Sequence, residues 1–453
     1  MSIPAWGLLP FAALLACIAL LPLLPATARR WEHNSAKLVV ALGLGIPVAL
    51  WVWFGGSPQL VTHSLAEYAQ FIILLFSLYT VSGGLFLDGN ILATPRNNTL
   101  LLAVGGLLAS FIGTTGAAML LIRPLLNTNR ERAHKAHTII FTIFIVANCG
   151  GVLTPLGDPP LYIGLLRGVP FTWTFTLWPE WLCTIVLLLV TYYGIDKRAY
   201  AAESPAAIAW DGAAHRPLRL KGGLNIVFFA VIIAAVACLG EYPLIRIGVQ
   251  LGAAALSYCL GSKTVRHKDN AFTWAPIIEV AVLFAGIFLT MIPALEFLRA
   301  HAQQLPLNEY TLFGFTGALS SVLDNAPTYL TFFEMATQLT APGQAVVAGV
   351  PALYLSAISL GAVMWGAMTY IGNGPNFMIK AVAEESGVVM PGFGAYISWA
   401  ARYLLPVLIV QVTVFISRNW PVRAAGIVLA LVLVVRAVWM ARRPPQPVRP
   451  GRY

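Results

Sequence analysis

The sequence has few charged residues for its length. Only 10% of the 453 residues are Asp, Glu, Lys or Arg, whereas 58% are hydrophobic. A soluble domain is about 25% charged and about 45–50% apolar. So few charges cannot cover the water-facing surface of a chain this long, which excludes a soluble enzyme, a nucleic-acid-binding module and a disordered scaffold. The sequence therefore predicts a polytopic membrane protein.

Cysteine is also scarce, and the residue groups of common active sites are absent. The sequence shows neither a nucleophile with its general base nor a set of metal ligands, so we predict that the protein is not an enzyme and has no cofactor apart from a coupling ion. The cysteines have no metal-ligand spacing and no disulfide framework, and we interpret them as small hydrophobic residues. All five lie inside apolar runs: Cys17, Cys149, Cys183, Cys238 and Cys259.

The first apolar run, residues 5–25, lacks the features of a signal peptide. Arg29 and Arg30 follow the run instead of preceding it, and no small-x-small cleavage site is evident. A secretory signal has its positive charges in front of a shorter apolar region. We therefore expect residues 5–25 to form the first transmembrane helix.

Long apolar runs, in contrast, are abundant. A bilayer core about 30 Å thick needs about 20 apolar residues for each crossing helix. Two of the runs carry small and polar residues at their centres, which is unusual for a crossing helix. We expect an all-α protein of about 11 spans, with apolar runs near residues 5–25, 37–54, 66–87, 99–126, 138–166, 172–195, 223–240, 243–260, 274–297, 309–336, 347–382, 395–417 and 420–440.

The positions of Lys and Arg predict the orientation, because cytoplasmic loops are rich in these residues. The segment 55–65 has neither and is placed outside. The basic loops on both sides of 99–126 are both cytoplasmic only if this segment is a re-entrant hairpin that turns at Gly113–Gly116. The same count makes 309–336 a hairpin that enters from the outside. This threading places the N-terminus outside. The C-terminus and most of the 28 Lys and Arg residues lie inside.

Two segments far apart in the chain match in register. Residues 151–162 read Gly-Val-Leu-Thr-Pro-Leu-Gly-Asp-Pro-Pro-Leu-Tyr, and residues 366–377 read Gly-Ala-Met-Thr-Tyr-Ile-Gly-Asn-Gly-Pro-Asn-Phe. The tip of the first hairpin, 109–115, similarly aligns with 320–326. Because the two halves have opposite predicted orientation, they form an inverted repeat, which is typical of alternating-access transporters.

This repeat divides the chain into five parts. Residues 1–65 form N-terminal transmembrane helices, and 66–195 are the first repeat with its cytoplasmic-side hairpin. Residues 196–222 are a hydrophilic cytoplasmic loop, and 223–417 are the second repeat with its external-side hairpin. Residues 418–453 add a C-terminal helix and a basic tail outside the repeat.

Both matching segments contain helix-breaking residues in mid-span. Proline removes a backbone donor and clashes with the preceding turn. Irregular backbone survives in a membrane only where it lines a cavity or is packed in protein. We therefore expect two broken helices whose ends meet the two hairpin tips near the membrane midplane. The residues that break the helices are Gly157, Pro159, Pro160, Gly372, Gly374 and Pro375.

Asp324, at the tip of the second hairpin, is the first candidate for binding an ion. A carboxylate at the membrane centre costs at least about 2.5–3.5 kcal/mol, which a bound cation, a proton or a pore has to offset. Asp158 is its candidate partner, although an Asp before two prolines can also simply cap a half-helix. Oxygen ligands suit hard cations, so both carboxylates are candidate Na⁺ ligands. The other candidate ion- or substrate-binding residues are Asn325, Asn373, Thr154, Thr369, Ser321, Thr114 and Thr115.

The stretch from Asn148 to Pro160, together with Asp324-Asn-Ala-Pro-Thr328, resembles the ion transporter superfamily. That group includes NhaD-type Na⁺/H⁺ antiporters, arsenite permeases, citrate transporters and divalent-anion symporters. The motif Gly-Gly-x-x-Thr-Pro-x-Gly-Asp-Pro-Pro is specific to the superfamily and not to a substrate. The resemblance covers roughly residues 66–417 and implies a midplane site between a scaffold and a transport domain, elevator-type movement and a homodimer. The Ser-Asn-Thr signature that divalent-anion symporters carry at both hairpin tips is absent.

We predict an ion-coupled secondary active transporter of the bacterial inner membrane. The first hypothesis is Na⁺/H⁺ antiport, in which the two ions compete for the Asp324 carboxylate with help from Asp158. The alternative is cation-coupled transport of citrate or another small anion, held by half-helix N-termini. The expected partners are the lipid bilayer, a small inorganic cation, a small organic anion and a second copy of the chain, with no nucleic acid.

Overall fold

The computed structural model describes residues 4–442 except Leu23, Glu32, Ala214, residues 340–342 and Gln344. The basic tail beyond Arg442 therefore lies outside the described residues. Within them, six helices are long and apolar enough to cross a membrane, and a bent pair of helices makes a seventh candidate. Further apolar helices are shorter, so the chain is a helical, polytopic membrane protein, while the number of about 11 spans stays a prediction.

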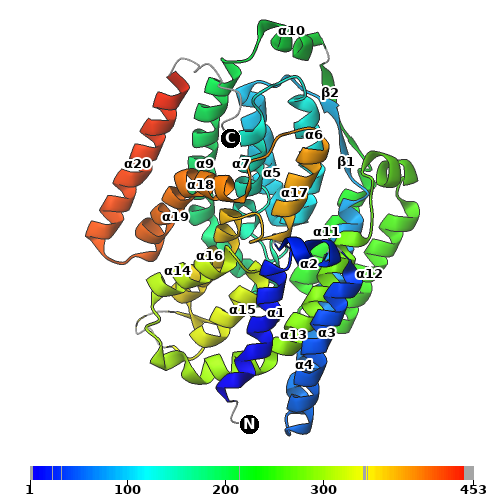
Figure 1. Cartoon of the computed structure of the whole chain (residues 1–453), viewed down its shortest axis with the longest axis vertical. Coiled ribbons are helices and arrows are strands. Elements are labelled where there is room, and N and C mark those ends of the chain that lie inside the picture. The colour runs from blue at the N-terminus through cyan, green and yellow to red at the C-terminus, as the bar shows by residue number, and fades with distance from the viewer. Residues whose placement is uncertain are drawn as a thin grey trace.

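Helices from the N-terminal region and from the middle of the chain pack into one bundle. In Figure 1, α3 and α4 lie beside α12 and α13 at the lower right. The apolar helix α13 contacts α1, α3 and α4, and α12 contacts both α4 and α11. The elements of this bundle are η1 (Ala5–Leu8), α1 (Leu9–Leu20), α2 (Pro25–Trp31), α3 (Asn34–Phe54), α4 (Pro58–Ser82), α11 (Leu224–Cys238), α12 (Pro243–Leu260), the short helix η4 (Thr264–Asp269) and α13 (Ala275–His301).

The remainder of the first half contains a hairpin and a broken helix. The broken helix consists of α7, a short 3-10 turn and α8, which are separated by an irregular stretch that ends at Asp158. The elements are β1 (Phe86–Asn90), α5 (Pro95–Ile112), α6 (Thr114–Thr128), α7 (Ala136–Ile145), η2 (Cys149–Val152), α8 (Pro159–Leu166), η3 (Phe171–Leu177) and α9 (Trp178–Tyr200).

The chain folds back between α5 and α6. Gly113 adopts φ +81°, a left-handed conformation that glycine accepts without strain. Asn98 near the start of α5 and Asn129 just after α6 exchange hydrogen bonds of 2.8 and 3.0 Å. In one continuous helix these residues would lie about 45 Å apart at 1.5 Å per residue. The segment 99–126 is therefore a helical hairpin, with both ends at the same side of the protein.

The second half repeats this order. Gln303 before α14 donates a 3.1 Å hydrogen bond to the carbonyl of Gln338 after α15, so this segment also folds back. The second hairpin lies in the lower part of Figure 1, whereas α5 and α6 lie in the upper part. The elements are η5 (Ala302–Gln304), α14 (Glu309–Ser320), α15 (Asn325–Ala336), β3 (Val346–Val347), β4 (Val350–Pro351), α16 (Ala352–Trp365), η6 (Gly366–Met368), α17 (Gly374–Glu385), α18 (Phe393–Tyr403), α19 (Leu405–Gln411), η7 (Val412–Ile416) and α20 (Trp420–Arg442).

The hydrophilic segment 196–222 is more ordered than a simple loop. It contains the end of α9, the short helix α10 (Pro205–Ala213) and the strand β2 (Arg216–Lys221). β2 pairs antiparallel with β1, with Phe86 opposite Lys221 and Asp88 opposite Arg219. The strand was not evident in the sequence because its ladder partner lies more than a hundred residues earlier. The pairing ties this segment to the entrance of the first hairpin.

The C-terminal helix α20 packs along α9 at the left edge of Figure 1. The described chain begins at the lower end of the molecule, and α20 ends at the upper end. The two ends thus lie on opposite sides of the protein, and which side faces the cytoplasm stays a prediction.

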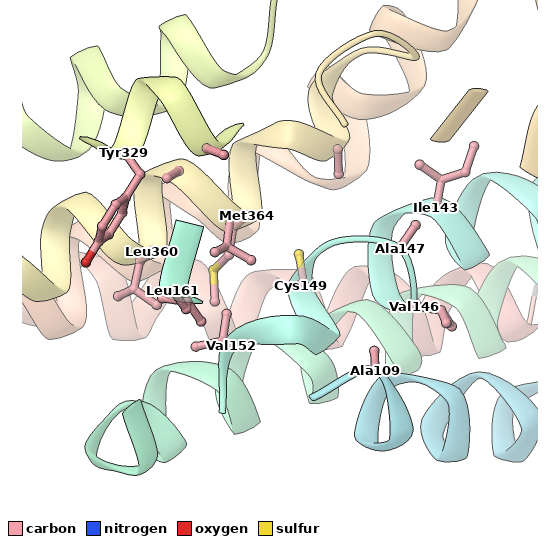
Figure 2. Close-up of a cluster of buried hydrophobic side chains, with 14 of the residues drawn as sticks. Ala109, Ile143, Val146, Ala147, Cys149, Val152, Leu161, Tyr329, Leu360 and Met364 are labelled. Carbon is pink, nitrogen blue, oxygen red and sulfur yellow. The ribbon is translucent and has the colours of Figure 1, made fainter. Parts of the chain in front are cut away.

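A continuous apolar core surrounds the first broken helix. Figure 2 shows Cys149 and Val152 of the broken segment among side chains from α5, α8, α15 and α16. Such close packing compensates for backbone that is not helical, because it excludes lipid from the break. The other labelled side chains of this cluster are Ala109, Ile143, Val146, Ala147, Leu161, Tyr329, Leu360 and Met364.

Candidate functional site

The first broken helix restarts at Asp158, which is the N-cap residue of α8. Its backbone is extended, with φ −145° and ψ 144°. Pro159 and Pro160 follow at the first two helical positions, where a missing N–H leaves no hydrogen bond unmade. The preceding Gly157 is required by space, since a Cβ at that position would overlap the carbonyl oxygen of Gly151.

The second broken helix has the same construction at the matching positions. Asn373 is the N-cap residue of α17, and its φ of −153° and ψ of 138° are close to those of Asp158. Gly374 and Pro375 begin α17. A Cβ at Gly372 would lie too close to the carbonyl oxygen of Gly366, which repeats the contact between Gly157 and Gly151.

Two threonines fasten the breaks to the hairpins. The Thr154 hydroxyl donates to the carbonyl of Ser110 in α5 and accepts the N–H of Leu156 at 3.1 Å. The Thr369 hydroxyl donates to the carbonyl of Ser321 at the end of α14 at 2.5 Å, and it accepts the N–H of Ile371 at 3.2 Å. Both predicted residues therefore position the site through backbone contacts.

The Asp158 carboxylate lies where all four irregular elements meet. Its Oδ1 accepts hydrogen bonds from the Thr114 hydroxyl at 3.0 Å and from the Asn373 amide at 3.4 Å. Its Oδ2 accepts one from the Asn325 amide at 2.5 Å. Thr114 and Asn325 belong to the two hairpin tips, and Asn373 belongs to the second break. Asp158 itself is only 1% exposed.

Four helices begin around this carboxylate, namely α6, α8, α15 and α17. A helix N-terminus carries about half a positive elementary charge, which stabilises a nearby anion. None of the side chains that hydrogen-bond Asp158 is positively charged. The carboxylate is thus stabilised by neutral donors and helix ends, and no side-chain cation is bound to it.

Two buried asparagines that were not among the candidates support the site. Asn148 donates to the Asn376 side chain at 2.7 Å, and its own Oδ1 accepts from Asn373 at 3.2 Å. Asn376 donates to the carbonyls of Gly366 and Thr369. The two asparagines therefore link the broken helices to each other. Each is a polar side chain inside a predicted apolar run, and this was the signal that could have identified them.

The remaining candidates do not hydrogen-bond the Asp158 oxygens in the described part of the chain. Asp324 is half-buried at the N-cap position of α15, without a side-chain capping hydrogen bond. The Ser321 hydroxyl donates to the carbonyl of Ala318 in its own helix. Thr115 is half-buried beside Thr114. The described hydrogen bonds thus centre on the Asp158 carboxylate, whereas Asp324 lies at the second hairpin tip directly before Asn325.

The site offers oxygen atoms to a small cation. Among the described residues the buried Asn325 Oδ1 has no hydrogen-bond partner, although the amide nitrogen of the same side chain binds Asp158. The two Asp158 oxygens, the Thr114 hydroxyl oxygen and the Asn325 Oδ1 are hard ligands of the kind that Na⁺ prefers. A proton on Asp158 would neutralise the same charge. The site therefore offers one buried carboxylate to a small cation or a proton.

A polytopic helical fold with paired hairpins and broken helices around a buried carboxylate is the architecture of a secondary transporter. The comparison with family models agrees. A model described as "Putative citrate transport" matches residues 1–416, and the chain belongs to this family. The match confirms the predicted resemblance to the ion transporter superfamily and its citrate transporters. A search of curated proteins finds no match.

Proposed function

We propose that the protein is a cation-coupled transporter of a citrate-like carboxylate and that the coupling cation, Na⁺ or H⁺, binds at Asp158. The observation that carries this proposal is the contact of one buried carboxylate with Thr114, Asn325 and Asn373. These residues belong to both hairpin tips and to the second break. Occupancy of one ion site can therefore influence every irregular element of the protein.

Coupling follows from the cost of leaving the carboxylate charged. Neutral hydrogen bonds and helix N-termini offset only part of the desolvation of a buried ion. A cation at Asp158 removes the remaining charge, so it favours whichever conformation keeps the site enclosed. A ligand shifts a conformational equilibrium by the difference between its affinities for the two states. The conformational equilibrium therefore differs between the cation-loaded and the empty protein. Coupled transport requires such a difference.

The family supports a citrate-like anion as the solute. Na⁺/H⁺ antiport is the second candidate, and the absence of a positively charged partner among the side chains bound to Asp158 favours it. In that mechanism Na⁺ and H⁺ displace each other from Asp158, and no anion is carried. Asp324 directly precedes Asn325, whose side chain binds Asp158, and it belongs to the site in both mechanisms.

Transport by purified protein in proteoliposomes tests the proposal. We expect uptake of labelled citrate when an inward Na⁺ or proton gradient is imposed, and loss of that uptake in Asp158→Asn. A Na⁺-driven pH change in vesicles without citrate, with no citrate uptake, would replace the proposal by Na⁺/H⁺ antiport. Neither activity in well-folded, reconstituted protein would exclude both functions.

The predicted surroundings of the transporter complete the proposal. A bacterial inner-membrane location, an external N-terminus, a cytoplasmic C-terminus and a homodimer agree with the distribution of Lys and Arg and with the resemblance. Labelling of single cysteines in intact cells checks the orientation. Mass measurement of the detergent-solubilised protein checks the oligomeric state.

A further inference from the structure

A buried arginine in α12 has no carboxylate partner among the described residues. Arg246 is only 4% exposed, although it lies in an apolar membrane helix. One terminal nitrogen of its guanidinium donates to the Gln70 side chain of α4. The Nε–H is buried and has no hydrogen-bond partner. The guanidinium thus has a free donor and no negative charge to balance it.

Other buried cations of the described chain show how unusual this is. Lys37 is paired with Glu279 at 2.6 Å, and Arg132 is paired with Asp196 at 2.6 Å. Arg266 donates to the carbonyls of Thr80 and Ser257 and is covered by aromatic rings. Each of these residues has its charge neutralised or its donors occupied. Arg246 has neither.

Two more polar side chains with unused groups lie next to Arg246. Gln250, one turn further along α12, is 0% exposed, and neither its Oε1 nor its Nε2 makes a hydrogen bond of regular geometry with the described residues. Tyr162 of α8 is also buried. Its hydroxyl lies near the Gln250 amide and the Arg246 guanidinium, yet among the described residues it makes no hydrogen bond of regular geometry.

Unused polar groups of this kind are expensive to bury. An unsatisfied buried donor or acceptor costs about 1–3 kcal/mol, and an unpaired buried charge costs several kcal/mol. The donors that are left over are a guanidinium N–H, an amide N–H and a phenolic O–H. A carboxylate has acceptor sites enough for all three, and its charge balances that of the guanidinium.

We propose that Arg246, Gln250 and Tyr162 form a binding subsite for one carboxylate group of the transported anion. The identity of that anion rests on the proposed function. Tyr162 lies four residues after Asp158 on α8, which is about 6 Å along a helix. An anion on this subsite would therefore lie close to a cation at Asp158, and the two ligands would favour each other's binding.

The position of the subsite explains why the α8 N-terminus need not hold the anion. Pro159 and Pro160 have no N–H, so the first turn of α8 has fewer free donors than an ordinary helix start. The donors in the neighbouring region come instead from α12, which belongs to the bundle around α4 and α13. The anion would thus contact both the broken helix α8 and that bundle.

Ligand-dependent thermal stabilisation of the purified protein tests the subsite, since a ligand of the folded state stabilises it. The probes are citrate, tricarballylate, succinate and acetate at constant Na⁺ concentration. We expect Arg246→Gln to weaken citrate binding at least about tenfold and Tyr162→Phe to weaken it about threefold to tenfold, as for loss of a charge-assisted hydrogen bond. Arg246→Lys should retain part of the affinity. Arg299→Gln, a half-exposed arginine of α13, should leave it unchanged.

Stabilisation by Na⁺ separates this proposal from a purely structural role. It should be the same in all four variants, because none of them alters the Asp158 ligands. Citrate binding that is equal in wild type, Arg246→Gln and Tyr162→Phe would overturn the subsite and leave the proposed function standing. Wild-type protein that responds to Na⁺ but to none of the four carboxylates would overturn both.

The remaining outcomes also decide the matter. If Arg246→Gln does not fold, Tyr162→Phe removes a single hydroxyl and its citrate affinity is decisive. Loss of Na⁺ and citrate binding in equal measure would show that the cluster only supports the fold, and this would overturn the subsite.

Discussion

The two broken helices share one backbone design but differ in charge. Gly157 and Gly372 approach equivalent carbonyl oxygens, and Thr154 and Thr369 donate to equivalent hairpin carbonyls. At the helix N-cap, however, the first break has Asp158 where the second has Asn373. The backbone of the two breaks is therefore duplicated, whereas a charged N-cap residue is present in the first break alone.

The hairpin tips extend this asymmetry. Thr114 offers a hydroxyl and Asn325 an amide, and both donate to the carboxylate of the first half. Asn373 also turns its amide toward Asp158. The second half therefore donates hydrogen bonds to the carboxylate of the first half.

The largest effect is expected when the difference in charge is removed. Asp158→Asn gives both breaks the same amide, and the site loses the charge that attracts a cation. Interactions with a charged group are worth about 1.5–3 kcal/mol, so Na⁺ binding should weaken roughly ten- to a hundredfold, with loss of gradient-driven uptake. Thermal stabilisation by Na⁺ measures this. Undiminished Na⁺ binding in the variant would show that the cation lies elsewhere.

The shared backbone design can be tested with three glycines. Gly157→Ala and Gly372→Ala each place a Cβ against a carbonyl oxygen, whereas a Cβ at Gly374 has open space. Overpacking typically costs about 1–3 kcal/mol, and Gly374→Ala should stay within about 0.5 kcal/mol of wild type. Thermal unfolding in detergent ranks the three variants by stability. Equal stability of all three variants would contradict the matched contacts of the two breaks.

Substitution of the two threonines sharpens the same comparison. Thr154→Val and Thr369→Val keep the shape of the side chain and remove its hydroxyl, so each break loses its link to a hairpin. We expect about 1 kcal/mol of destabilisation in each case, with Thr115→Val as a control that touches neither link. A large loss in only one of the two variants would mean that the halves are not held in the same way.

The smallest effect on Na⁺ binding is expected at Asp324. Asp324 is half-buried, and no hydrogen bond joins its side chain to Asp158 among the described residues, so we expect its charge to be partly screened. Asp324→Asn should weaken Na⁺ binding by about threefold, as for a solvent-screened pair worth under about 1 kcal/mol. The same titration with Na⁺ compares it with Asp158→Asn. A loss as large as that of Asp158→Asn would restore Asp324 as the main ion ligand.

Much of the site could be predicted because its signals are local. Gly157, Pro159 and Pro160 interrupt a helix wherever they occur, and Gly372 to Pro375 do the same. The relative importance of Asp158 and Asp324 could not be predicted. Both are acids beside a break in an apolar run, and only the packing of the hairpins buries one and leaves the other half-exposed.

Residues that act through distant partners could not be found from the sequence. Asn148 and Asn376 meet across 228 positions, and an isolated Asn in an apolar run does not reveal its partner. The same is true of Arg246 and Tyr162, whose side chains come from different halves of the chain. Their unused donors became visible only when burial and hydrogen bonding were known for each atom.

Hydropathy, the distribution of Lys and Arg and the helix-breaking residues were enough to predict a membrane transporter with two broken helices and two hairpins. These signals act within short stretches of chain, so each can be recognised from neighbouring residues alone. Two features followed only from the fold: which carboxylate binds both hairpin tips, and which buried cation has no carboxylate partner among the described residues. Both properties depend on the desolvation of a group by segments that are far away in the sequence.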